Sequence, residues 1–428
     1  MKIKTRNLTY DEVLKLPRLK HKKPMKPSRF LATVVRVVSA PTLKKTQFSY
    51  TTERMELVGK NEPCLILMNH SSFTDMKLAF GIFYPRRMGI VTSVDAMSGF
   101  LGKLMRWLGC TPTHKYVSDY SLIRDIKYML KENKTSVLMY PEAGYSFDGC
   151  ATAMPKGLGV LMKRLGVPVV TVITQGAFHR DPLYNMLQVR DIKVSAHVKC
   201  IATAEELKEK SVEELDALLD EAFSFDNFAW QRDNRISIDV PYRADGLHRI
   251  LYKCPHCNEE NQMEGKGIHL TCHACGKKWE MDEYGQLCAI DDETEYSHIP
   301  DWYAWQRECV RREIEEGMYL LDTDVDISIQ VNLNGVCNIG KGHLRHDENG
   351  FHLTGADGKL DYKQSAVFSH TLYADYYCYE IGDVIGIGDN EFSYFCFPRD
   401  NTSVTKARLA TEELYKIKKV RRIRAEKE

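Results

Sequence analysis

Short apolar runs alternate with longer stretches of helical periodicity through the first half of the chain. Five runs of aliphatic and β-branched residues have the length of buried strands: 64–68, 88–92, 137–140, 169–173 and 192–200. Four stretches have helical spacing instead: 100–108, 119–132, 156–165 and 212–223. This alternation predicts an α/β fold in which helices cover a mixed, largely parallel sheet.

The pattern changes after about residue 240. Residues 300–322 have helical spacing, and most of the remaining chain alternates between polar and apolar positions as an antiparallel sheet does. Glu348-Asn349-Gly350 and Asp389-Asn390-Glu391 separate pairs of such strands and predict hairpin turns. A charged helix is expected over about 403–424. Hairpins closed by one terminal helix resemble a pleckstrin-homology-like barrel, so we expect a helix and a mainly β domain over residues 300–428.

Basic residues gather near the start of the chain, although its formal net charge is only +1. Seven Lys and Arg residues lie between positions 15 and 29, and an apolar stretch occupies positions 30–38. Arg36 interrupts that stretch, which is too short to span a bilayer but can lie in a membrane interface. We therefore expect residues 1–45 to be a leader that binds an anionic membrane surface. The alternatives are nucleic-acid binding, or a solvated basic segment beside an ordinary core helix.

The chain shows neither a signal peptide nor a run of eighteen apolar residues. We therefore expect a cytoplasmic protein held peripherally on the inner face of the cell membrane. In that compartment its thirteen cysteines should stay thiols or bind metal.

One stretch places candidate chemistry at a strand end: Asn69-His70-Ser71-Ser72-Phe73-Thr74-Asp75 comes directly after the apolar run at 64–68. Five residues of helix turn through about 500°, so His70 and Asp75 cannot share one helix face. They can meet only where the chain bends from strand to helix, which is where open α/β sheets usually build their sites. Asp75 would then bind one ring nitrogen of His70 and leave the other free as a base.

A second strand end carries a related set of polar residues. The run at 137–140 leads into Pro141-Glu142-Ala143-Gly144-Tyr145-Ser146, and Lys156-Gly157 and the strand at 169–173 come after it. In order and spacing these blocks resemble the glycerolipid acyltransferases of the lysophosphatidic acid acyltransferase family. That family carries a His-x4-Asp block, then Phe-Pro-Glu-Gly-Thr-Arg-Ser, then a Val-Pro-Val-type strand. The resemblance covers about residues 45–235 and predicts an acyltransferase domain at 46–240.

The resemblance implies an O-acyltransferase of class EC 2.3.1 that acts in phospholipid biosynthesis. It would move a fatty acyl group from acyl-CoA or acyl carrier protein to the hydroxyl of a lysophospholipid such as 1-acylglycerol-3-phosphate. His70 would be the general base and Asp75 would orient it, while hydrogen-bond donors stabilise the oxyanion. The residues that the resemblance assigns to substrate binding are Glu142, Gly144, Ser146, Lys115 and Lys156.

Two departures from the family pattern concern the binding of a phosphate. Tyr145 stands where the family has an arginine in its Glu-Gly-Thr-Arg-Ser block. A further family block, Gly-x-x-Phe-x-x-Arg, falls on 109–115, where Lys115 can supply a point charge but not a bidentate fork. Both changes weaken the case for a phosphate-bearing acceptor more than the case for acyl transfer.

Four cysteines in the middle of the chain form two Cys-x2-Cys pairs with fourteen residues between them. Such pairs suit a closed tetrahedral site, so we expect a small zinc ribbon over residues 245–290 with a structural Zn²⁺. Unligated thiols or a disulfide are the alternatives, and His256 or His273 could replace one thiolate. The expected ligands are Cys254, Cys257, Cys272 and Cys275.

The residues also leave other functions open. Gly144-Tyr145-Ser146-Phe147-Asp148-Gly149 resembles the nucleophile elbow of a serine hydrolase, but its second glycine comes one place too late. A thioesterase would differ from an acyltransferase only in using water as the acceptor. Glu142 and Lys156 also fit a solvated turn and an exposed helix start. A non-catalytic lipid-binding protein is a further alternative, whereas acidic residues in the expected ribbon offset its lysines and argue against nucleic acid.

Overall fold

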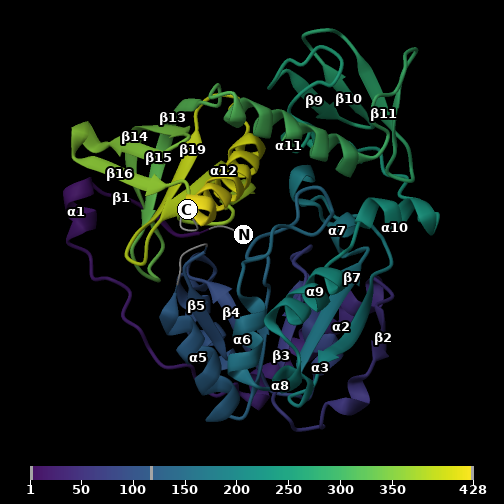
Figure 1. Ribbon diagram of the computed structural model, residues 1–428, viewed down its shortest axis with the longest axis vertical. Coiled ribbons are helices and arrows are strands. Elements are labelled where there is room, and N and C mark those ends of the chain that lie inside the picture. Colours follow the sequence, from purple (N-terminus) through teal and green to yellow (C-terminus); the bar gives the residue numbers. More distant parts are fainter. Residues whose placement is uncertain (1–2, 116–118, 426–428) are drawn as a thin grey trace.

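The computed structural model describes residues 3–115 and 119–425, and its first half forms a seven-stranded sheet (Figure 1). The strands of this sheet are β2 (Ser49–Glu53), β3 (Leu65–Met68), β4 (Met88–Ser93), β5 (Cys110–Thr113), β6 (Ser136–Met139), β7 (Val169–Gln175) and β8 (Ser195–Ala202). Their order is β2-β8-β7-β3-β6-β4-β5. All neighbours are parallel except β7 and β8, which confirms the expected mixed, largely parallel sheet.

Helices cover both faces of this sheet because its central strands are apolar on both sides. Leu65 and Leu67 of β3 belong to one core cluster with residues of α5, α6 and α9, and Ile66 and Met68 belong to another with residues of α2 and α3. The helices are α2 (Arg29–Lys45), α3 (Asp75–Phe83), α4 (Phe100–Leu108), α5 (Tyr120–Lys131), α6 (Leu158–Leu165), α7 (Ala177–Arg180), α8 (Glu206–Glu209), α9 (Val212–Ala222) and α10 (Asn227–Asp233).

A small antiparallel sheet comes after the α/β region. Its strands are β9 (Met263–Lys266), β10 (His269–Cys272), β11 (Lys278–Met281) and β12 (Leu287–Ala289), in the order β12-β11-β10-β9. Trp279 of β11 is fully buried and packs against Trp302 of the next helix, α11 (Ile299–Glu315). The small sheet is therefore anchored on α11.

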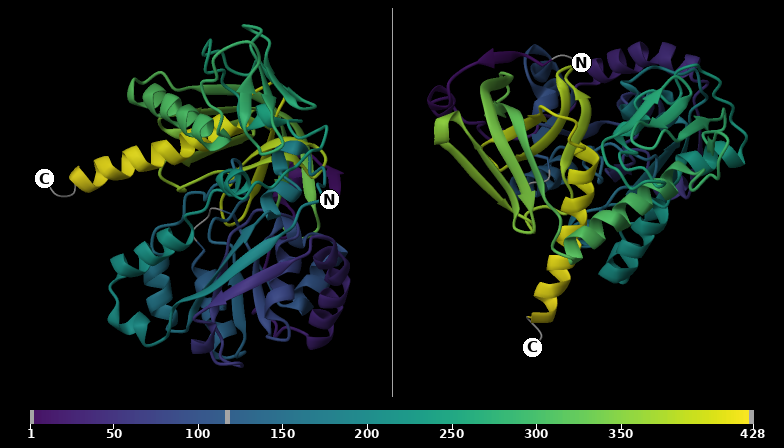
Figure 2. Two further views of the ribbon diagram at one scale, coloured as in Figure 1. Left: turned by 90° about the vertical axis from the view of Figure 1, so that its right-hand side faces the viewer. Right: turned by 90° about the horizontal axis from the view of Figure 1, so that it is seen from above.

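The rest of the chain forms a separate antiparallel region, as the alternation predicted. Its strands are β13 (Leu321–Gln330), β14 (Val336–Asp347), β15 (Gly350–Gly355), β16 (Leu360–Ser365), β17 (Tyr373–Cys378), β18 (Gly382–Gly388) and β19 (Ser393–Pro398). They run in the order β16-β15-β14-β13-β19-β18-β17 and are followed by α12 (Val404–Ala425). Figure 2 shows α12 extending away from the body of the molecule. The likeness to a pleckstrin-homology barrel remains a prediction.

The N-terminal leader is tied to this C-terminal region. Strand β1 (Thr5–Asn7) pairs in parallel with the start of β14, and α1 (Tyr10–Leu14) buries Val13 in the core of the C-terminal region. The basic segment then crosses to α2, which begins after the capping residue Ser28. None of the described helices is long and apolar enough to cross a membrane. The first part of the leader is thus a folded element and not a detached tail.

Candidate active site

His70 and Asp75 meet where the central strand β3 ends and α3 begins. His70 lies two residues beyond β3, and Asp75 is the first residue of α3. The Nδ1 atom of His70 lies 2.8 Å from Oδ2 of Asp75. The backbone N–H groups of Ser71 and Ser72 donate to the same oxygen at 2.9 and 3.1 Å. The buried carboxylate therefore fixes the histidine ring and the bend that carries it.

Glu142 holds the backbone of this bend from the neighbouring strand. It lies just beyond β6, has no exposed surface, and accepts a hydrogen bond from the backbone N–H of His70 at 3.1 Å. Its second oxygen accepts from the N–H and the hydroxyl of Thr152 at 2.8 and 2.9 Å. Burial raises the pKa of Glu142 to about 7, although these donors act in the opposite direction. Because both oxygens are used internally, Glu142 orders two loops and does not face open space.

Two tyrosines enclose the imidazole ring of His70. Tyr140 stacks on one side with its centroid 4.2 Å away, and Tyr145 stacks on the other at 3.9 Å. Phe73 extends the stack, 5.1 Å from Tyr145. Only the edge of the His70 ring is left open, and that edge carries Nε2. Tyr145, which replaces the family's arginine, thus supplies an aromatic wall where a phosphate-binding cation was expected.

Carboxylates surround this aromatic stack. Burial raises the pKa of Tyr145 well above its usual value, and the negative charges of Asp75, Asp375 and Asp181 raise it further. Asp181 accepts a 2.5 Å hydrogen bond from the Ser72 hydroxyl, and burial raises its own pKa to about 6. Sequence reasoning missed Asp181 and Asp375. The first comes after a short helix without a motif, and the second lies in β17, far along the chain.

The other predicted substrate-binding residues divide into two groups. Ser146 is buried beside the site, where its N–H donates to the His70 carbonyl and its hydroxyl donates to the Cys150 carbonyl at 2.6 Å. That buried, donating hydroxyl is poorly placed for a serine nucleophile. Gly144 lies between Glu142 and Tyr145 in the same loop.

Lys115 and Lys156 lie outside this hydrogen-bonded group. Lys115 places its ammonium 3.7 Å from the centroid of the Tyr373 ring, in a pocket between the α/β and C-terminal regions. Lys156 is exposed just ahead of α6. Within residues 3–115 and 119–425, no hydrogen bond or ion pair joins either lysine to His70.

The four predicted cysteine ligands lie together. Their Sγ atoms are all within 4.8 Å of one another, with Cys254 and Cys275 3.8 Å apart and Cys257 and Cys272 3.7 Å apart. A tetrahedron with Zn–S bonds of about 2.3 Å has S–S edges of about 3.8 Å, whereas a disulfide needs about 2.05 Å. The cluster therefore has the size of a closed metal site with four thiolates.

Comparisons with known proteins bear on the α/β region. Residues 49–175 match the protein-family model described as Acyltransferase, in agreement with the resemblance drawn from the motifs. Among solved structures, the chain is similar to the crystal structure of the 1-acyl-sn-glycerophosphate (LPA) acyltransferase PlsC from Thermotoga maritima. That match has 17% sequence identity and a TM-score of 0.33, and covers 46% of this chain and 82% of that chain. No curated protein sequence matches the chain significantly.

Proposed function

We propose that the acyltransferase domain at residues 49–175 moves a fatty acyl group from an acyl thioester to the hydroxyl of a lysophospholipid. The observation that carries this proposal is the hydrogen bond between His70 and Asp75 at the end of β3. Asp75 accepts the proton on Nδ1, so the unprotonated Nε2 can act as a general base at the open edge of the ring.

The reaction needs no covalent enzyme intermediate. Nε2 of His70 takes the proton of the acceptor hydroxyl while that oxygen attacks the thioester carbon. The carbon–sulfur bond then breaks, and the leaving thiolate takes the proton back from the imidazolium. Glu142 and Ser146 act as positioning residues through the backbone of His70, and Gly144 lies between them in the same loop. We assign Lys156 to phosphates of the donor, which is acyl-CoA or acyl carrier protein.

Thiol release from acyl-CoA and acyl carrier protein, measured across a panel of lysophospholipids, tests this proposal. The wild type should release thiol only with an acceptor, and His70→Ala should lower the rate on the order of 10² to 10⁴. His352→Ala, on an exposed histidine of β15, is the matched control and should keep full activity. Equal release without any acceptor would indicate a thioesterase. A folded His70→Ala enzyme with near-normal turnover would refute the role of the base.

We also propose that the cysteine cluster binds one structural Zn²⁺ per chain. Four thiolates fill a tetrahedral coordination sphere, so no position is left for a substrate. Metal analysis of protein purified without chelators should give one zinc per chain, and Cys254→Ser should lower this content. Cys309→Ser, outside the cluster, should leave the zinc content unchanged. Protein that is folded but contains no zinc would contradict the assignment.

A membrane-binding surface is proposed on α2 and α4. Phe30 of α2 is 74% exposed and Trp107 of α4 is 56% exposed. The two helices are adjacent: the N–H of Ser28, the capping residue of α2, donates a hydrogen bond to the carbonyl of Trp107 at 2.9 Å. Val34, Val37 and Val38 continue the exposed apolar face along α2, and exposed cations flank it. Apolar side chains beside basic ones are typical of helices that lie in a membrane interface.

Vesicle flotation tests this surface without deleting folded parts of the leader. Binding to anionic vesicles should weaken as salt rises, because screening shortens the reach of surface charges to about 8 Å at physiological ionic strength. The double variant Phe30→Ser, Trp107→Ser should lose most of the vesicle binding that persists at high salt. Met318→Ser, an exposed apolar residue after α11, is the control. Unchanged binding by the double variant would exclude this surface.

A further inference from the structure

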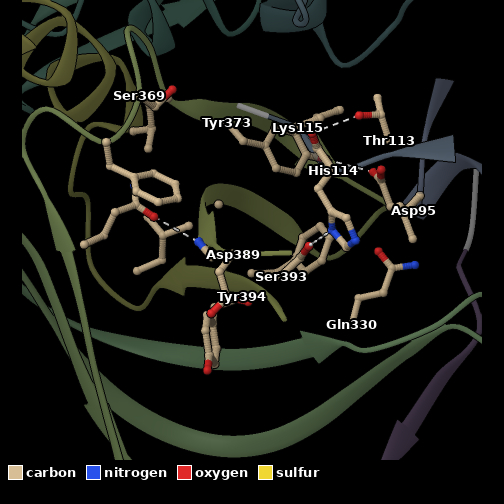
Figure 3. Close-up of a pocket in the computed structure, with 18 of the residues that line it drawn as sticks. Asp95, Thr113, His114, Lys115, Gln330, Ser369, Tyr373, Asp389, Ser393 and Tyr394 are labelled. Carbon is tan, nitrogen blue, oxygen red and sulfur yellow. Dashed lines mark hydrogen bonds between the residues drawn. The ribbon is translucent and has the colours of Figure 1, made fainter. Parts of the chain in front are cut away.

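The C-terminal region packs against the edge of the α/β sheet that carries the candidate site. Asp95 follows β4 as His70 follows β3, so both lie where parallel strands end. Tyr373 donates a hydrogen bond to Asp95 at 3.2 Å, and Gln330 donates one to Ser98 at 2.9 Å. Asp95, Gln330 and Tyr373 also line the pocket between the two regions that Figure 3 shows. Side chains of the C-terminal region therefore contact the same edge of the sheet as the candidate base.

Arg408 of α12 makes a further contact of this kind, with the loop after β6. Its side chain is 3% exposed, and its Nη1 donates a hydrogen bond to the backbone carbonyl of Tyr145 at 3.1 Å. The guanidinium also lies over the ring of Phe147, with Cζ 4.3 Å from the ring centroid. Tyr145 and Phe147 belong to the same loop, so one buried arginine restrains both its backbone and one of its side chains.

Glu412 holds the guanidinium of Arg408 in place. Nε of Arg408 donates to Oε1 of Glu412 at 3.3 Å, and that oxygen also accepts the Thr371 hydroxyl at 2.6 Å. Arg307 of α11 donates to the second oxygen of Glu412 at 2.6 Å. A planar guanidinium can bind a carboxylate and a carbonyl at the same time in a fixed geometry, whereas the ammonium of a lysine is a flexible point charge. Arg408 thus links the charged network of the C-terminal region to the loop.

The loop is in turn in contact with the candidate base. The Tyr145 ring stacks on the imidazole of His70 with centroids 3.9 Å apart. The N–H of the next residue, Ser146, donates to the His70 carbonyl at 3.1 Å. Arg408 therefore binds the backbone of the residue that covers the ring of His70, next to the residue that binds the backbone of His70.

We propose that Arg408 is a positioning residue that holds Tyr145 against His70, so that the C-terminal region completes the candidate active site. This inference rests on the proposed acyl transfer and adds to it a residue from outside the acyltransferase domain. Without Arg408, the Tyr145 ring is free to turn away, and His70 loses one of the two aromatic walls that fix the plane of its ring. The rate depends on this plane, because a displacement of about 1 Å can slow a reaction about 100-fold.

Steady-state acyl transfer by the full chain tests this role. Arg408→Gln should lower kcat about 10- to 100-fold and leave the KM of donor and acceptor within about twofold, because it alters the geometry of the base. Arg307→Gln is the matched control, since Arg307 donates to Glu412 and to Glu413 of α12. It removes the other guanidinium from Glu412 and should keep kcat near the wild-type value. Equal losses of kcat in the two variants would reduce Arg408 to a stabilising residue and overturn the proposal.

Two further variants keep the proposal falsifiable if Arg408→Gln does not fold. Arg408→Lys keeps a positive charge beside Glu412 but loses the fixed pair of hydrogen bonds, so its kcat should also fall. Wild-type kcat in Arg408→Lys would overturn the proposal. Tyr145→Leu removes the aromatic wall itself and should lower kcat. The double variant Arg408→Lys, Tyr145→Leu should be no slower than Tyr145→Leu, because both changes disrupt one contact. Losses that multiply would mean that Arg408 does not act through the Tyr145 ring.

An NMR measurement separates this inference from the proposed function. The ring protons of His70, assigned by their absence in His70→Ala, lie between two aromatic rings whose ring currents shift their signals. In Arg408→Lys these signals should move toward those of an unstacked histidine, and the signals of His352 in β15 should not move. Unmoved His70 signals would refute the positioning role even where acyl transfer occurs. If the signals move but no acceptor supports transfer, the positioning contact is supported and the proposed function is wrong.

Discussion

The α/β region and the C-terminal region each bury a glutamate, and they stabilise it in different ways. Glu142, behind the candidate base, accepts hydrogen bonds from His70 and Thr152 and from no cation among the described residues. Glu412 of α12 is 2% exposed. It accepts hydrogen bonds from the Thr371 hydroxyl and from the guanidinium groups of Arg307 and Arg408.

The two environments give opposite protonation behaviour. Burial raises the pKa of Glu142 to about 7. Burial also opposes ionisation of Glu412, but Arg307 and Arg408 outweigh it and lower its pKa to about 2. A charged network holds the C-terminal helix in place, whereas the α/β region keeps a carboxyl that titrates near neutral pH. The same side chain therefore serves as a permanently charged anchor in one region and as a titratable group near the site in the other.

The largest expected effect concerns Asp75, the carboxylate that is hydrogen-bonded to His70. Asp75→Asn should lower the rate of acyl transfer on the order of 10² to 10⁴, because an amide can also bind the wrong tautomer of His70. Circular dichroism should show a folded protein. Transfer at the wild-type rate would mean that Asp75 does not orient the base.

On the C-terminal side, Glu412→Gln should lower the free energy of unfolding by about 3–5 kcal/mol, because Arg307 and the buried Arg408 both lose a charged partner. Denaturant unfolding measures this loss. Glu315→Gln, which breaks an exposed pair with Arg311, should change stability by less than about 1 kcal/mol. Equal losses of stability in Glu412→Gln and Glu315→Gln would show that the buried network of Glu412 stabilises the chain no more than an exposed ion pair.

A pH series sharpens the comparison at Glu142. Its pKa is higher in the folded chain than the ordinary 4.5, so its contribution to stability is full below pH 4.5 and is lost as pH rises through about 7. The loss is up to about 3 kcal/mol. Glu142→Gln cannot ionise and should show a flatter stability profile between pH 5 and 8. Parallel profiles of variant and wild type would show that Glu142 is ionised throughout.

The smallest effect comes from the residue after Glu142. Ala143 has a φ of 56°, in the left-handed region that glycine adopts without strain. Ala143→Gly should therefore stabilise the folded chain by about 1 kcal/mol through the relief of backbone strain. The greater conformational entropy of glycine in the unfolded chain should reduce this gain. Thermal unfolding detects such a change. A destabilised variant would indicate that the methyl group of Ala143 contributes packing that outweighs the backbone strain.

Local patterns in the sequence determined the main elements. Helical periodicity predicted the helix at 100–108 with the bounds of α4, and the apolar run at 64–68 predicted β3 to within one residue. The strand expected at 192–200 starts and ends earlier than β8, which spans Ser195–Ala202, because the ends of β8 depend on its pairing with β7. The dyad was visible as well, since a histidine and an aspartate on either side of one bend are neighbours in sequence.

Contacts between distant segments were decided only by the tertiary structure. No local pattern indicates that β1 pairs with β14, because that pairing joins segments more than 300 residues apart. Asp375 is likewise an ordinary strand residue until β17 folds beside the loop of Tyr145. Periodicity reports which side of an element is buried, but not against which partner. The sequence therefore predicted that His70 and Asp75 meet, while the fold decided what surrounds them.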